Sequence, residues 1–138
     1  MDEERPILTN YAIGLLLVMG FHMLFNGASV LLYPDIFSEE MYDSVYYQWI
    51  FVGLGIWEFL MAVLLYLGSG LAYKATTLFL FVLLVMTITN MVAGGRFGFD
   101  IWIQTLLGGI SFAILEVPRV KRFYDNWSLG HLPDFSVD

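Results

Sequence analysis

Hydrophobic positions gather in four long runs, which short polar stretches separate. The runs cover residues 7–32, 48–67, 75–93 and 99–117. A helix needs about 20 mainly apolar residues to cross the hydrocarbon core of a bilayer, with a range of about 17–25. The first three runs meet that length, and the fourth is short but reaches about 17 apolar residues once Phe99 and Val117 are included. The pattern therefore predicts an all-α chain, a four-transmembrane-helix antiparallel bundle that forms a single domain over residues 1–138.

The segments between the runs predict how the helices are connected. Residues 68–74 and 94–99 contain paired or closely spaced glycines, so both predict tight turns. Residues 33–47 are acidic and rich in tyrosine, and they fit either a short interfacial helix that starts at Ser38 or an irregular polar loop. Residues 118–138 are expected to form a cytoplasmic tail, whose basic and aromatic first part lies along the lipid surface.

Basic residues set the expected orientation. In a bundle of four spans, the N-terminus, the turn at residues 68–74 and the C-terminus share one side. That side holds Arg5, Lys74, Arg119, Lys121 and Arg122, whereas the opposite side holds only Arg96. Cytoplasmic segments carry an excess of lysine and arginine. We therefore expect an integral protein of the cell membrane or inner membrane, with both termini in the cytoplasm.

Composition supports the membrane interpretation and excludes several classes of protein. The 138 residues are 59% hydrophobic and 14% charged, whereas a soluble domain carries about 25% charged residues. Because the chain has no cysteine, it contains neither disulfides nor thiolate metal sites. The formal net charge of −7 argues against a nucleic-acid partner. The lipid bilayer is the first partner that this composition indicates.

Glu58 is the one charged residue within the second run. It lies about ten residues into that helix, which places it roughly 15 Å below the outer surface and close to the midplane. An acid at this depth costs about 2.5–3.5 kcal/mol on insertion scales, and such acids are usually paired or functional. His22 lies at a similar depth on the antiparallel neighbour. The two side chains are therefore expected to be able to meet as a pair.

Further polar residues lie in the half of the predicted bundle that faces outward. Asn26 follows His22 by one helical turn and shares its face. Asn90 and Gln104 lie near the outer ends of their helices, and Arg96 and Asp100 are expected to form an ion pair at the interface. Two interpretations stay open. These side chains form hydrogen bonds between helices, or they line an outward-facing polar pocket with Glu58 and His22 at its floor.

No catalytic motif is present. The sequence contains no nucleophile elbow, phosphate-binding loop, dinucleotide fingerprint or set of metal ligands at a recognised spacing. Glycines at helical spacing, such as Gly20 and Gly55, predict close approach of helix backbones. No cofactor and no metal are inferred from the residues, and a quinone or a lipid is the ligand that the polar pocket would suit.

The segments GLLLVMGFHMLFNGASVLLYP and GLGIWEFLMAVLLYLG, followed by a third span and a short fourth span, resemble the DoxX-like superfamily of small four-helix membrane proteins. The resemblance covers nearly the whole chain in layout and is most specific at residues 53–68. It implies that Glu58 matches an acid that recurs in the second helix of many members. Arg5 is the nearest counterpart of the basic residue that the family carries near the start of its first helix.

Members of this family are associated with quinone-linked respiratory complexes or with the assembly of other membrane proteins. The resemblance therefore implies a small non-catalytic subunit or assembly factor of a larger membrane complex, respiratory or oxidative in kind, with other integral membrane subunits as partners. The chain would then not be an enzyme on its own, but a subunit of an oxidoreductase complex. The alternative is a membrane protein that binds a quinone or a lipid in a pocket around Glu58 and His22.

Overall fold

The computed structural model describes residues 5–33, 45–95 and 99–130, which form five α-helices. In chain order these are α1 (Ile7–Leu32), α2 (Val45–Tyr66), α3 (Gly70–Val92), α4 (Phe99–Leu115) and α5 (Pro118–Gly130). The described part of the chain contains no strand. The prediction of an all-α protein is confirmed.

Three helices are long and apolar enough to cross a membrane: α1, α2 over Gln48–Tyr66, and α3. α4 has 17 residues, at the lower limit for a span, and together with α5 it forms a bent pair, with axes that differ by 69°, which counts as a fourth candidate span. The structure therefore supports an integral membrane helical bundle with three or four spans.

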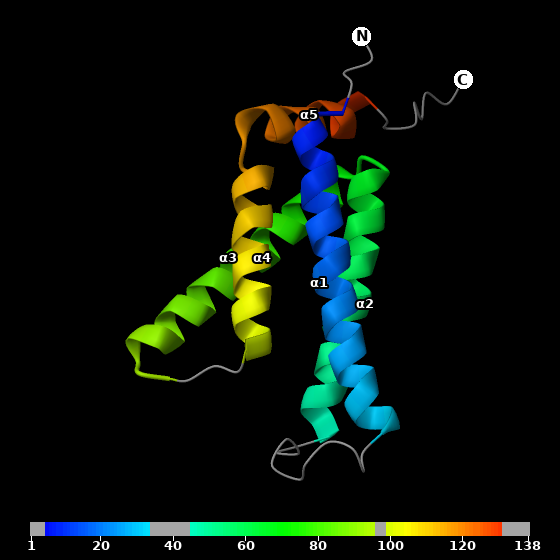
Figure 1. Cartoon of the computed structure of the whole chain (residues 1–138). Coiled ribbons are helices and arrows are strands. Elements are labelled where there is room, and N and C mark those ends of the chain that lie inside the picture. Colours follow the sequence, from blue (N-terminus) through cyan, green and yellow to red (C-terminus); the bar gives the residue numbers. More distant parts are fainter. Residues whose placement is uncertain (1–4, 34–44, 96–98, 131–138) are drawn as a thin grey trace, which may run out of the picture.

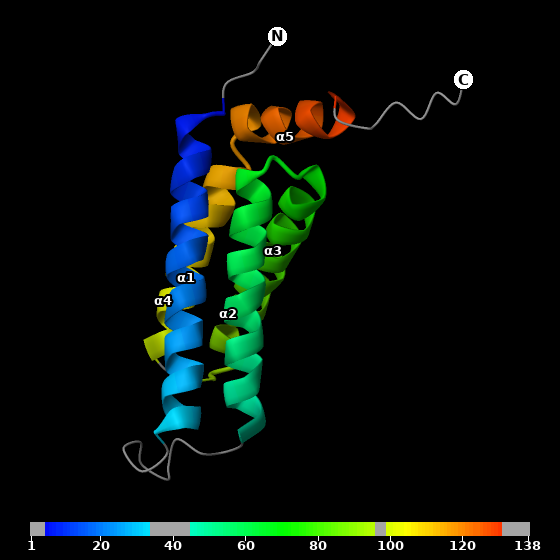
Figure 2. The same ribbon diagram turned by 90° about the vertical axis from the view of Figure 1, so that its right-hand side faces the viewer.

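The helices are arranged as an antiparallel bundle with α5 across one end (Figure 1). α1 makes its most extensive contact with α2 and a second contact with α4, while α3 packs mainly on α4. Both views show α5 beside the beginning of α1 and the turn between α2 and α3 (Figure 2). From that end α3 runs obliquely, and its axis diverges from α2 (Figure 1).

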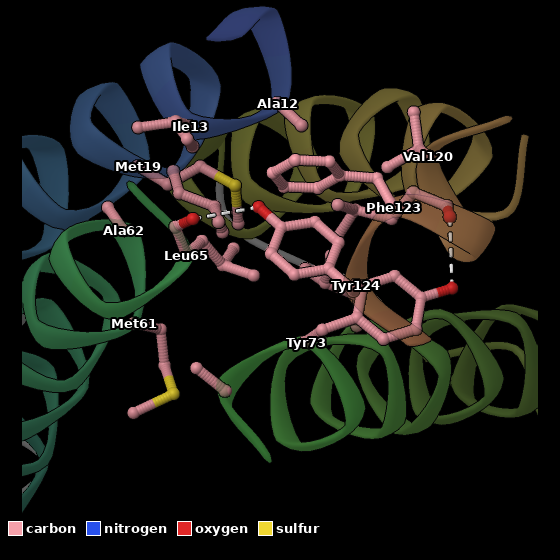
Figure 3. Packing of buried hydrophobic residues seen from close by; sticks show 14 residues of the cluster. Ala12, Ile13, Met19, Met61, Ala62, Leu65, Tyr73, Val120, Phe123 and Tyr124 are labelled. Carbon is pink, nitrogen blue, oxygen red and sulfur yellow. Dashed lines mark hydrogen bonds between the residues drawn. The ribbon is translucent and has the colours of Figure 1, made fainter. Parts of the chain in front are cut away.

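The most completely buried side chains lie near the end that α5 covers. They come from all five helices and include Leu16, Leu65, Leu80, Leu115, Val120 and Tyr124. Two tyrosines stabilise this region through hydrogen bonds to backbone carbonyl groups of other helices (Figure 3). The hydroxyl of Tyr73 donates to the carbonyl oxygen of Leu115 at 3.1 Å, and that of Tyr124 donates to the carbonyl oxygen of Leu65 at 2.9 Å. The last turn of α4 is thereby joined to α3, and the last turn of α2 is joined to α5.

The turn between α2 and α3 is shorter than residues 68–74, which the sequence predicted. Gly68 adopts a positive φ of 84°, and α3 begins at Gly70. Ser69 is the N-cap of α3, since its hydroxyl accepts a hydrogen bond from the backbone N–H of Ala72 at 3.2 Å. A serine cap satisfies one of the free N–H groups of the first turn. The cap at Ser69 therefore fixes where the helix starts.

The predicted tail at residues 118–138 needs correction over residues 118–130, and residues 131–138 lie outside the described part of the chain. Pro118 starts α5, as proline favours the first position of a helix. Val120, Phe123 and Tyr124 are buried against the bundle, so α5 belongs to the core rather than to a tail. The interfacial helix considered for residues 38–47 falls mostly outside the described residues, and α2 begins at Val45.

Candidate functional site

Glu58 lies inside the bundle, on the face of α2 that packs against α1, and its side chain is 1% exposed. Gly20 of α1 lies directly opposite. A Cβ atom on Gly20 would lie 3.3 Å from the Cβ of Glu58 and 3.0 Å from the carbonyl oxygen of Gly55. A Cβ atom on Gly55 would lie 2.8 Å from the carbonyl oxygen of Gly20. The two backbones are therefore in contact beside the acid.

Gln104 approaches α1 from the opposite neighbour, α4. Its side chain is 1% exposed, and its Nε2 donates to the carbonyl oxygen of Met19 at 3.0 Å. Met19 precedes Gly20, so the structure brings Glu58 and Gln104 to adjacent residues of α1. Both side chains come from the set that the sequence singled out, and both lie inside the bundle rather than toward lipid.

Several oxygen atoms in this interior have no hydrogen-bond partner among the described residues. They are Oε2 of Glu58, Oε1 of Gln104, Oγ1 of Thr9, Oγ1 of Thr76 and Oγ of Ser111. Sequence reasoning did not select Thr9, Thr76 or Ser111 as site residues. Ser111 follows Gln104 by two helical turns, and this spacing in the sequence indicates that the two residues share a face of α4. A buried oxygen atom that stays without a partner costs about 1–3 kcal/mol.

His22 and Asn26 lie on α1 closer to its C-terminal end than Gly20, and both are half-buried. The Nδ2 of Asn26 lies 3.2 Å from the Nε2 of His22. The sequence expected these residues to share a face, one turn apart, and they contact one another there. This polar pair lies next to the α1–α2 contact, which continues at Gly27, where a Cβ would lie 2.8 Å from the carbonyl oxygen of Gln48.

Asn90 lies apart from this interior group. It is about 30 Å along α3 from Gly70, at 1.5 Å per residue, at the end where α3 has diverged from α2 (Figure 1). Its side chain folds onto the turn that follows the helix, so that a Cβ on Gly95 would collide with the Asn90 carboxamide. Asn90 therefore packs against the end of its own helix. Arg96 and the side chain of Asp100 lie outside the described residues, and their ion pair stays a prediction.

Two large aromatic residues of α1 and α2, Phe25 and Trp57, take different places. Trp57 packs on Phe79 of α3, with ring centroids 4.4 Å apart and planes at 47°. Phe25 is 62% exposed and lies on the outside of α1. Trp57 therefore fills the space between α2 and α3 where these helices are still close, whereas Phe25 faces the surroundings of the bundle.

This interior can form hydrogen bonds between helices, and its helices are tightly packed on the α1–α2 side. Among the described residues, no three histidine, aspartate or glutamate side chains converge as a metal site requires.

In comparisons with known proteins, no family model, no curated protein and no solved structure matches the chain.

Proposed function

We propose that this chain is a small non-catalytic integral membrane subunit or assembly factor of a larger membrane complex, and that α3 packs against a partner subunit. The observation that carries the proposal is the poor burial of α3. Only 17% of the residues in its most apolar stretch are buried, against 33% in α1 and 28% in α2, although α3 is the most apolar of the three spans.

The exposed surface of α3 is continuous over its second half. Beyond Leu80, Thr87 is the only described residue of α3 that is buried. The exposed apolar side chains there are Phe81, Val82, Val85, Met86, Ile88, Met91 and Val92. A helix in a bundle normally buries a stripe against its neighbours. Lipid can cover such a surface, but a partner helix beside the divergent half of α3 would complete the bundle.

Gln104 and the two glycines of this interior fit a structural role in such a subunit. Gln104 already bonds α4 to α1, and the contact of Gly20 with Gly55 closes the α1–α2 side beside Glu58. A quinone or lipid bound between Glu58 and His22 would have to separate these backbones. That alternative therefore has less support than the subunit role. The respiratory, quinone-linked setting is what the DoxX-like resemblance implies.

We also propose that the end of the bundle that carries α5 faces the cytoplasm. Arg5, Lys74 and the basic residues of α5 all lie at that end. The excess of positive charge in cytoplasmic segments supports this orientation. Reaction of single cysteines with a membrane-impermeant maleimide tests it: a cysteine at Lys121 should be labelled only after the cell membrane is opened.

Site-specific photocrosslinking in the native membrane tests the subunit role. A photoreactive phenylalanine at Met86, which is 66% exposed on α3, should give a discrete crosslinked product that contains another integral membrane protein. The matched control is Phe21, which is 64% exposed on α1. Phe21 should give lipid adducts only. If Met86 also gives lipid adducts only, and the chain extracted in mild detergent migrates alone, the proposal is wrong.

A further inference from the structure

A groove of about 810 Å³ lies between the beginning of α1 and the beginning of α5, and Glu58 does not line it. Three arginines line it: Arg5, Arg119 and Arg122. Arg119 and Arg122 are one helical turn apart on α5, so their side chains are neighbours on the helix surface. Three guanidinium groups around one groove favour an anionic ligand, and a guanidinium matches the oxygen atoms of a phosphate group in particular.

Arg5 is already held in place and keeps a donor unused. Its guanidinium donates to the carbonyl oxygen of Tyr66, and its Cζ atom lies 4.4 Å from the centroid of the Tyr66 ring. Its Nε is buried and has no hydrogen-bond partner among the described residues. A buried charged donor without an acceptor is costly, so an acceptor supplied by a ligand would be favourable here.

The backbone around the groove also favours negative charge. α1 and α5 both begin there, and neither has an acidic residue in its first turn. The N-cap of α1, Pro6, makes no side-chain cap. Helix N-termini carry partial positive charge and attract phosphate. Of the acids at this end that lie within residues 5–33, 45–95 and 99–130, Glu116 and Asp125 are exposed and do not line the groove.

The groove also has an apolar side. Ile7 and Leu8 line it and are 73% and 41% exposed. These residues begin the first span, and α5 lies across the same end of the bundle (Figure 2), at the level expected for lipid headgroups. A free anion would make no use of the two apolar side chains, whereas a phospholipid would place its acyl chains along them.

We propose that this groove binds an anionic phospholipid, with the headgroup phosphate between the three arginines and the acyl chains along Ile7 and Leu8. Basic pockets at the cytoplasmic ends of membrane helices recognise lipid headgroups in this way. The inference does not depend on the proposed subunit role, because it concerns lipid at the opposite end of the bundle from the divergent half of α3.

Native mass spectrometry of the purified full chain in neutral detergent tests the proposal, with equimolar dioleoylphosphatidylglycerol and dioleoylphosphatidylcholine as probes. The wild type should retain phosphatidylglycerol in preference. The double variant R119Q/R122Q should bind it about thirtyfold more weakly, since each of the two basic residues contributes about 1 kcal/mol near an anionic headgroup. Both arginines are exposed, so the fold should persist, which circular dichroism and thermal melting check.

The matched control is K74Q/K121Q, which changes the net charge equally at the same end of the bundle but outside the groove. It should retain phosphatidylglycerol as the wild type does. Equal loss in both double variants would show general charge attraction and overturn the proposal. Equal retention of phosphatidylcholine by the wild type would also overturn it. Displacement of the lipid by millimolar inorganic phosphate would identify a free-anion site instead.

Discussion

The rings of Tyr73 in α3 and Tyr124 in α5 stack with their centroids 5.0 Å apart and their planes at 16° (Figure 3). Each hydroxyl donates to the carbonyl oxygen of a residue near the end of another helix, Leu115 or Leu65. One pair of residues thereby links α2, α3, α4 and α5. Stacked aromatic pairs contribute about 0.5–1.5 kcal/mol beyond the area they bury. This pair explains why a polar helix such as α5 stays folded against the bundle.

Tyr124→Phe should lower the free energy of unfolding by about 0.5–1.5 kcal/mol, the net value of one hydrogen bond. The ring would remain, and only the bond to the Leu65 carbonyl would be lost. Unfolding in detergent, followed by circular dichroism, measures the change. Tyr11→Phe is the control, because Tyr11 is 61% exposed and should tolerate the change. An equal effect of both substitutions would contradict the role assigned to Tyr124.

Removal of α5 should destabilise the bundle far more than removal of an unpacked tail would. A chain that ends after Val117 loses the buried side chains of Val120, Phe123 and Tyr124, each worth about 1.5–3 kcal/mol when fully buried. We expect a lower melting temperature or loss of the folded bundle. A chain that ends after Gly130 keeps α5 and should melt as the full chain does. If both truncations melt alike, α5 is not part of the core.

The atoms around each glycine predict at which positions an added methyl group lowers stability. Gly55→Ala would place a Cβ 2.8 Å from the Gly20 carbonyl oxygen and 2.9 Å from the backbone nitrogen of Leu24. Because these are backbone atoms, α1 and α2 must move apart, at a cost of about 1–3 kcal/mol. Gly53→Ala meets nothing within 4 Å and should be neutral or slightly stabilising. Comparison of the two melting temperatures checks this, and equal values would contradict the close contact.

The bounds of α1 were predictable from the sequence, but α5, the start of α3 at Gly70 and the oblique course of α3 were not. The lengths of the apolar runs are set by the thickness of the bilayer, so the ends of α1 at residues 7 and 32 came out as expected. In a membrane, however, the outside of a helix is as apolar as its inside. The pattern along α3 therefore does not show that its second half diverges from α2, and this divergence takes Asn90 away from Glu58.

The apolar surroundings of the helices also explain why the burial of some interior residues was predictable and that of others was not. Glu58 and Gln104 were expected to avoid lipid because exposure of an acid or an amide to hydrocarbon is costly, and both are buried. The roles of Tyr73 and Tyr124 escaped sequence reasoning, because a tyrosine near a membrane end is typical of the headgroup region. Only the packing of α5 on the bundle shows that these two rings belong to the core.

Glu58→Leu separates the structural and functional interpretations of the buried acid. Oε2 of Glu58 is buried without a partner among the described residues, and leucine fills a similar volume without a polar atom. We expect Glu58→Leu to raise the free energy of unfolding of the isolated chain by about 1–3 kcal/mol, the cost of an unsatisfied polar group. Glu58→Gln keeps the shape and a polar side chain, and should stay close to the wild type. Unfolding in detergent measures both. A large loss of stability in Glu58→Leu alone would instead show that the carboxyl group holds the helices together.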